Sequence, residues 1–151
     1  MKHARLQSLI FGVVVMSFDV VAQPKHYSEY ELKVSDCIRL EKQKQPVMAA
    51  DLKRFKRDEV AVSIFYLKDK RIVDCSARSE LISLAHALQS SSFNLDSLKL
   101  QYLSLEMIAK EEKFQRLPLD FRNDFIKAVE GKSLEINLLD LFDEIDDLIS
   151  K

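Results

Sequence analysis

The chain has 151 residues, of which 47% are hydrophobic and 31% are charged, and its formal net charge is −1. This is the composition of one ordinary globular domain, not of a disordered or fibrous chain, and it lacks the strongly basic balance typical of nucleic-acid-binding proteins. Glycine and proline are scarce, at two and three residues. Because tight turns favour these residue types, their scarcity argues against a sandwich or barrel and favours an all-α fold.

The N-terminal segment, residues 1–22, has the pattern of a cleavable signal peptide. Lys2 and Arg5 form a basic start, and residues 9–18 form an apolar run. A membrane-spanning helix needs about 20 apolar residues, so cleavage before Gln23 is favoured over a membrane anchor. We therefore expect an exported protein, periplasmic or secreted, with no stable membrane anchor.

The remaining chain, residues 23–151, is long enough for one core, and we expect a single helical domain, a compact bundle of five or six helices. A capping-box pattern at Ser28 and Glu31 predicts a first helix to about Lys44, and Pro46 ends it. Its apolar residues follow a 3–4 spacing that defines the buried face. The positions on this spacing are Tyr30, Val34, Cys37 and Ile38, and Glu41 can be added to them.

The most basic stretch, residues 47–57, surrounds Leu52 and Phe55 with four cations. One interpretation is a patch that interacts with an anion, a membrane surface or a partner. The favoured interpretation is a solvated helical turn from which Leu52 and Phe55 pack inward. The four cations of this possible interaction patch are Lys53, Arg54, Lys56 and Arg57.

The central stretch, residues 58–90, begins apolar on every side, which predicts a helix enclosed by others. Four charged residues at 68–71 predict a break, although one continuous kinked helix stays open. Its last third has one apolar stripe, expected to face the core, with polar residues mostly on the other side. The stripe consists of Cys75, Ala77, Leu81, Ile82, Leu84, Ala85 and Leu88; the polar side consists of Arg78, Ser79, Glu80, Ser83 and His86.

Three further helices are predicted. One runs from Leu95 to about Arg116 and should be central, because it has two apolar sides. The next follows Pro118 and ends near a glycine cap at Gly131. The last can be capped by Asn137, and its apolar stripe should dock onto the body of the protein.

The ends of the domain differ in charge. Residues 134–151 carry six acidic side chains and one basic side chain, whereas residues 39–57 carry seven basic and two acidic ones. The two segments could meet, or each could face a different partner. Whether the basic stretch or the acidic last helix is functional stays open.

Two cysteines, Cys37 and Cys75, remain in the exported chain, and an even cysteine count in an oxidising compartment favours a disulfide. Their separation of 38 residues does not fit a C-x-x-C redox pair, and a zinc site needs more ligands at short spacing. Reduced thiols that react with a partner are the rival interpretation. We predict a buried bond that serves stability alone.

No nucleotide-binding, zinc-protease or serine-hydrolase motif occurs. Ser83 and His86 share a helix side, but no orienting acid accompanies them. Glu111 and Glu112 are adjacent and point in different directions on a helix. We therefore expect no enzyme, no catalytic, cofactor-binding or metal-ligating residue, and no cofactor.

Binding is the remaining class of function. The chain is similar to the small disulfide-linked helical proteins that bacteria export to bind one other protein, among them inhibitors and immunity proteins, but only in its signal peptide, helices and disulfide. We expect a partner that is itself exported or part of the envelope, and no nucleic acid. The alternative is a periplasmic carrier of a lipid or other apolar ligand, which needs an internal cavity. A solid core with an exposed apolar or charged patch would favour the partner protein.

Overall fold

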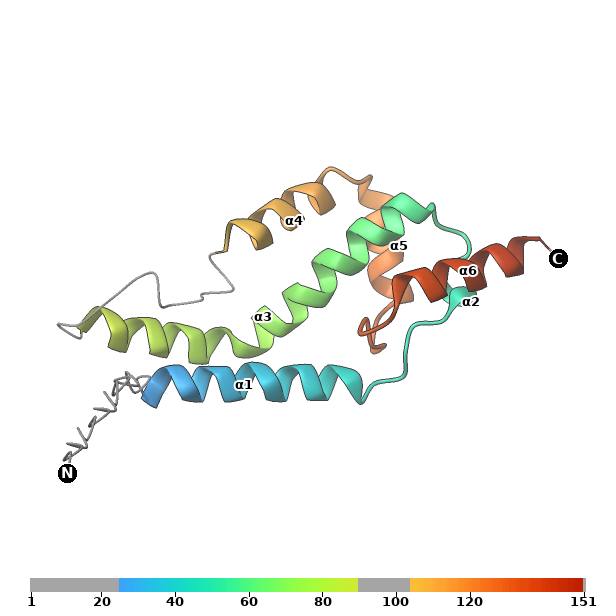
Figure 1. The fold of residues 1–151 in the computed structure, drawn as a ribbon. Coiled ribbons are helices and arrows are strands. Elements are labelled where there is room, and N and C mark those ends of the chain that lie inside the picture. Colours follow the sequence, from blue (N-terminus) through green and yellow to red (C-terminus); the bar gives the residue numbers. More distant parts are fainter. Residues whose placement is uncertain (1–24, 90–103, 151) are drawn as a thin grey trace, which may run out of the picture.

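The protein is described by a computed structural model, which covers residues 25–89 and 104–150. The signal peptide and the first part of the helix predicted from Leu95 lie outside these residues. In the described part the fold is all-α, as predicted, and contains one disulfide (Figure 1). Its six helices are α1 (Lys25–Lys42), α2 (Ala49–Leu52), α3 (Arg57–Gln89), α4 (Leu105–Gln115), α5 (Leu119–Ala128) and α6 (Leu138–Ile149).

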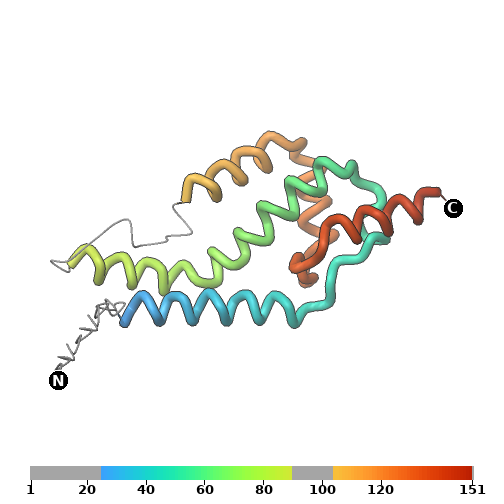
Figure 2. Tube along the Cα trace, viewed as in Figure 1, coloured from blue at the N-terminus to red at the C-terminus, as the bar shows by residue number. Residues whose placement is uncertain are grey.

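The longest helix, α3, bends near its middle (Figure 2). The break predicted at residues 68–71 does not occur, because these charged side chains pair with their surroundings while the backbone stays helical. Lys70, for example, lies 2.8 Å from Asp74 one turn later. In the second half of α3 the Ser76 hydroxyl donates to the Ile72 carbonyl at 2.9 Å, a side-chain contact that often bends helices.

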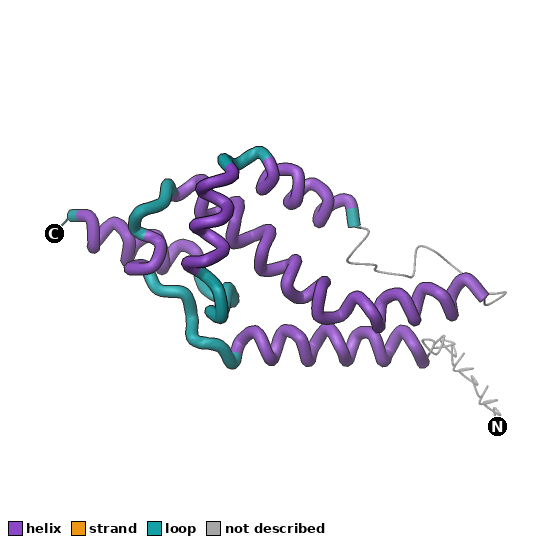
Figure 3. Tube along the Cα trace, turned by 180° about the vertical axis from the view of Figure 1, so that it is seen from behind, coloured by secondary structure: helices purple, strands orange, loops and turns teal. Residues whose placement is uncertain are grey.

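The described chain has two parts, which we call the arm and the head. The arm consists of α1 and residues 72–89 of α3, which lie side by side and extend away from the other helices (Figure 3). The head consists of residues 57–71 of α3 together with α2, α4, α5 and α6. The two parts are therefore connected by the continuous helix α3.

The core of the head is filled by side chains from every one of its helices and from the loop before α6. Leu52 is fully buried and Phe55 packs partly buried against the core, which confirms the inward packing predicted for these two residues. The predicted docking of α6 is confirmed for Leu141, Phe142 and Ile145, which are buried, whereas Leu148 and Ile149 at the end of the predicted stripe are exposed. The fully or nearly fully buried apolar residues include Leu52, Val60, Ile64, Phe114, Phe125, Val129, Leu134, Leu141 and Ile145.

One isolated bridge links the segment after α1 to the loop before α6. The Val47 amide donates to the Ser133 carbonyl at 3.1 Å, and the Ser133 amide donates to the Gln45 carbonyl at 2.7 Å. The chain reaches this position through Gly131, whose φ of 70° is left-handed backbone that favours glycine. The loop between α5 and α6 is thus fixed against the segment that follows α1.

Two helices differ from their predicted extent. The first begins at Lys25, before the capping-box serine, and its first turn is supported by pairs from Lys25 and His26 to Glu29. The α4 helix begins at Leu105, because Ser104 caps it by accepting a hydrogen bond from the Met107 amide at 3.1 Å. It is also peripheral in its described part, not central, with Phe114 as its single buried residue.

The arm reverses the predicted orientation of α3. Glu80 and Ser83 of the predicted polar side are buried, together with Ser76, on the side of α3 that faces α1, while most of the predicted apolar stripe is exposed. We call the contact between α1 and the second half of α3 the seam. It pairs large side chains with small ones, because α1 contributes buried tyrosines and α3 contributes serines. A buried serine hydroxyl costs little where a carbonyl one turn earlier accepts its hydrogen bond, as at Ser76. The buried tyrosines of α1 are Tyr27 and Tyr30.

Candidate functional site

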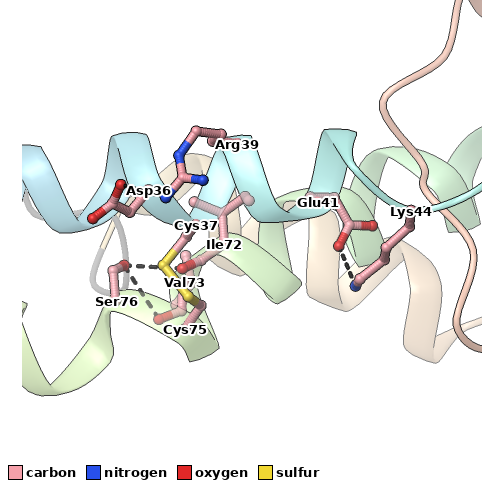
Figure 4. Close-up of a disulfide and its surroundings, with 9 residues drawn as sticks. All are labelled: Asp36, Cys37, Arg39, Glu41, Lys44, Ile72, Val73, Cys75 and Ser76. Carbon is pink, nitrogen blue, oxygen red and sulfur yellow. Dashed lines mark hydrogen bonds and ion pairs between the residues drawn. A yellow bond between two sulfur atoms is a disulfide. The ribbon is translucent and has the colours of Figure 1, made fainter.

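The disulfide joins α1 to α3 at the base of the arm. Cys37 and Cys75 are bonded, with their Cα atoms 6.0 Å apart (Figure 4). Cys37 is 3% exposed, whereas Cys75 lies on the exposed side of α3. The predicted bond is confirmed, but its burial is correct for Cys37 alone, because the reversed orientation of α3 turns Cys75 outward.

Glu41, at the end of α1, is a buried charged residue at the junction of arm and head. Its side chain is 3% exposed and accepts hydrogen bonds from Arg71 at 2.8 Å, from Lys44 at 2.5 Å and from the Leu134 amide at 3.3 Å. Arg71 also donates to the carbonyls of Val129 and Lys132. One ion pair therefore connects α1, α3 and the loop before α6.

The electrostatics of Glu41 follow from these contacts. Burial raises the pKa of this carboxyl and is the largest single influence, but the hydrogen bonds and charges of Lys44 and Arg71 together outweigh it. The pKa of Glu41 consequently lies below its usual value. Sequence reasoning missed this role, although a glutamate on an otherwise apolar helical spacing was a usable signal for it.

The residues considered for chemistry lie apart or have other contacts. Ser83 is buried in the seam of the arm, whereas the ring of His86 stacks on His26 with centroids 3.6 Å apart. The Glu111 carboxylate accepts a hydrogen bond from Tyr66, and Glu112 pairs with Arg116 on its own helix. In the part of the chain that the structure describes, no three His, Cys, Asp or Glu side chains are arranged to hold a metal ion.

The basic stretch is partly occupied by contacts within the protein. Arg57 donates to Asp146 at 2.7 Å and lies 4.6 Å from the centroid of the Phe142 ring, while Arg54 covers the Phe55 ring. The basic segment and the acidic last helix therefore meet through Arg57 and Asp146. Lys53 and Lys56 are exposed and make no ion pair with another described residue.

The arm carries an exposed set of apolar side chains, which we call the apolar row. Leu81 is 64% exposed, Ile82 44% and Leu88 63%, and Ala85 is exposed between them. Their spacing places them along one side of α3, opposite the seam with α1. The sequence indicated this grouping of residues but not the direction in which it faces.

The head carries a shallow groove of about 250 Å³ between the start of α2 and the C-terminal half of α6, which we call the α2–α6 groove. Four apolar residues and two carboxylate residues of α6 line it. No sequence signal pointed to it, because its two sides are about 95 residues apart in the chain. Its lining residues are Met48, Ala49, Ala50, Glu144, Asp147 and Leu148.

A larger cleft of about 470 Å³ lies where α1, α3 and α4 approach one another. Its lining mixes apolar residues with six charged ones, several of which pair across it. Lys68 lies 2.9 Å from Glu135, and Lys110 lies 2.5 Å from Asp69. The apolar lining consists of Ile38, Ile72, Val73 and Met107, and the charged lining of Lys42, Lys68, Asp69, Glu106, Lys110 and Glu135.

Among the helices within residues 25–89 and 104–150, none is both long enough and apolar enough to cross a bilayer. No protein-family model, no curated protein and no solved structure matches this chain. The apolar row, the α2–α6 groove and the cleft are therefore the features from which a function can be inferred.

Proposed function

We propose that this is an exported protein that binds another exported or envelope protein and catalyses no reaction. The apolar row on α3 is the observation that carries the proposal. A single exposed leucine is ordinary on a protein surface, but several exposed apolar side chains along one helix are typical of an interaction site.

The energetics of the apolar row fit a binding surface. Full burial of a leucine or isoleucine side chain contributes about 1.5–3 kcal/mol, so covering three half-exposed ones would contribute about 1 kcal/mol or more each. The disulfide and the seam hold α3 against α1, so the row is presented on a fixed support. Little ordering of the backbone is then needed when a partner covers it.

Two features support export. The basic start and short apolar run at residues 1–22 are the pattern of a signal peptide. The Cys37–Cys75 disulfide is of a kind that persists in oxidising compartments. A periplasmic or secreted location accounts for both features.

A carrier of a lipid or other apolar ligand has less support. Sites for such ligands are mostly apolar with few polar groups, whereas six of the residues lining the 470 Å³ cleft are charged. The cores of such carriers must also leave room for the ligand, and the core of the head is filled by buried side chains.

Site-directed photo-cross-linking tests the proposal. A photoreactive phenylalanine is placed at Leu81 or Leu88 in cells that export the protein, and at Glu112, an exposed position on α4, as the control. We expect a discrete adduct with one other protein from positions 81 and 88 and none from position 112. Equal adducts from all three positions, or none from the row, would contradict the proposal.

A further inference from the structure

We propose that the α2–α6 groove is a second binding site, one that takes an apolar side chain flanked by lysine or arginine residues on a segment of a partner protein. This goes beyond binding at the apolar row, because the groove lies in the head, on other helices. It also specifies the chemistry of the segment that fills it.

The walls of the groove are apolar and well supported. Met48 is 55% exposed and Leu148 is 43% exposed, so each presents apolar surface to solvent. Ala49 and Leu141, on the inner sides of the two helices, are buried and fix the helices on the core. A side chain that enters the groove therefore meets a fixed apolar lining.

Two carboxylates of α6, Glu144 and Asp147, make the lining of the groove negatively charged. Neither Glu144 nor Asp147 forms an ion pair with another residue of the described chain. By contrast, Asp146, on another side of the same helix, pairs with Arg57 at 2.7 Å, and Asp51 of α2 pairs with Lys132 at 2.6 Å. Within residues 25–89 and 104–150 the two carboxylates at the groove therefore have no cationic partner, and a partner protein can supply one.

Charge complementarity decides which occupant fits. Two carboxylates beside an apolar lining favour a segment that carries basic side chains on either side of an apolar one. They repel the anionic surface of a membrane. A second copy in a two-fold contact would bring the same two carboxylates to the interface, because such contacts pair one patch with itself. A basic segment of a different protein remains as the occupant.

Binding of a synthetic peptide tests the site. The probe is a dye-labelled, 14-residue amphipathic peptide of leucine and lysine, and its counterpart has glutamine in place of lysine. We expect saturable binding of the lysine peptide, followed by fluorescence anisotropy, and much weaker binding of the glutamine peptide. Added salt should weaken binding, because exposed charge pairs are screened.

Paired variants distinguish the groove from general attraction to an acidic protein. Glu144→Gln with Asp147→Asn should weaken binding about two- to tenfold, and Leu148→Ser should also weaken it. The controls are Asp124→Asn with Glu130→Gln, which remove the same charge from exposed positions elsewhere in the head, and Leu139→Ser, at an exposed leucine of α6 outside the groove. We expect the controls to bind within twofold of the unaltered protein.

Two outcomes would overturn the inference. One is equal weakening in the groove variants and the controls, which would show unspecific attraction. The other is the absence of saturable binding at millimolar peptide. Unchanged circular dichroism spectra of the variants exclude misfolding as the cause of a loss. Cross-linking at the apolar row is scored independently, so failure of one site does not decide the other.

Discussion

A single buried charge, that of Glu41, stabilises the junction of arm and head. It accepts hydrogen bonds from Arg71, from Lys44 and from the Leu134 amide. Replacing Glu41 with glutamine keeps the shape but leaves Arg71, which is largely buried, without its counter-charge. We expect Glu41→Gln to lower the free energy of unfolding by about 2–4 kcal/mol, measured by urea denaturation at pH 7.

An exposed acid provides the control for this substitution. Asp36 lies on the same helix and pairs with Arg39 at 3.1 Å in solvent. Asp36→Asn should change the free energy of unfolding by less than about 1 kcal/mol. Equal losses in the two variants would show that the contacts of Glu41 contribute no more to the free energy of unfolding than those of an exposed acid.

The stability difference between the unaltered protein and Glu41→Gln should depend on pH. Because the pKa of Glu41 is lower in the folded state than its ordinary value of 4.5, its contribution to stability is complete above pH 4.5 and is lost as the pH falls through the folded-state pKa. We expect the difference between the unaltered protein and Glu41→Gln to be constant from pH 6 to 8 and to shrink below pH 4.5. A difference that does not shrink below pH 4.5 would contradict this explanation.

At the scale of single elements, α6 depends on its inner face. Phe142 is 9% exposed and lies beneath the Arg57 guanidinium, whereas Leu139, on the outer side of the helix, is 71% exposed. Phe142→Ala should lower the free energy of unfolding by about 3–5 kcal/mol. Leu139→Ala should change it by less than about 0.5 kcal/mol. Similar values for the two variants, measured by thermal and urea denaturation, would argue against docking of α6 by this face.

The existence and type of the elements could be predicted from the sequence, but their orientation could not. The 3–4 spacing of apolar residues correctly indicated helices within residues 25–89 and the docked stripe of α6. A helical wheel shows which residues share a side, not which side faces a neighbour. Either side of the second half of α3 can pack against α1. The serine side can do so because the Ser76 hydroxyl donates to a carbonyl of its own helix and because small serines fit against the tyrosines of α1. The predicted side was therefore wrong there.

The surfaces were less accessible to sequence reasoning than the helices. The α2–α6 groove joins residues around 49 with residues around 147, and only the complete fold brings them together. The break at residues 68–71 was predicted because four charges in succession look solvated. Each of them is paired, through partners as distant in sequence as Glu41 and Glu135, which no local pattern reveals.

At the scale of the whole molecule, the arm and the head should differ in stability. The arm has α1 packed along α3, whereas the core of the head draws on several helices. Replacing both Cys37 and Cys75 with alanine removes a cross-link across 38 residues, for which loop-closure entropy gives about 4 kcal/mol. We expect amide hydrogen exchange to accelerate most at residues 25–37 and 76–89, with the smallest change at residues 119–128. Uniform acceleration would mean that the arm and the head unfold as one unit.

The bridge between Ser133 and the segment after α1 also bears on the order in which the protein can form. A chain delivered with its N-terminal end first, from a ribosome or through a membrane pore, presents Gln45 and Val47 long before Ser133 arrives. Leu134 and Ile145, both nearly fully buried, arrive later still. The core of the head therefore stays open until almost the whole chain has emerged. The export that we propose would therefore move a chain whose core is still open, and the core would close afterwards through contacts distant in sequence.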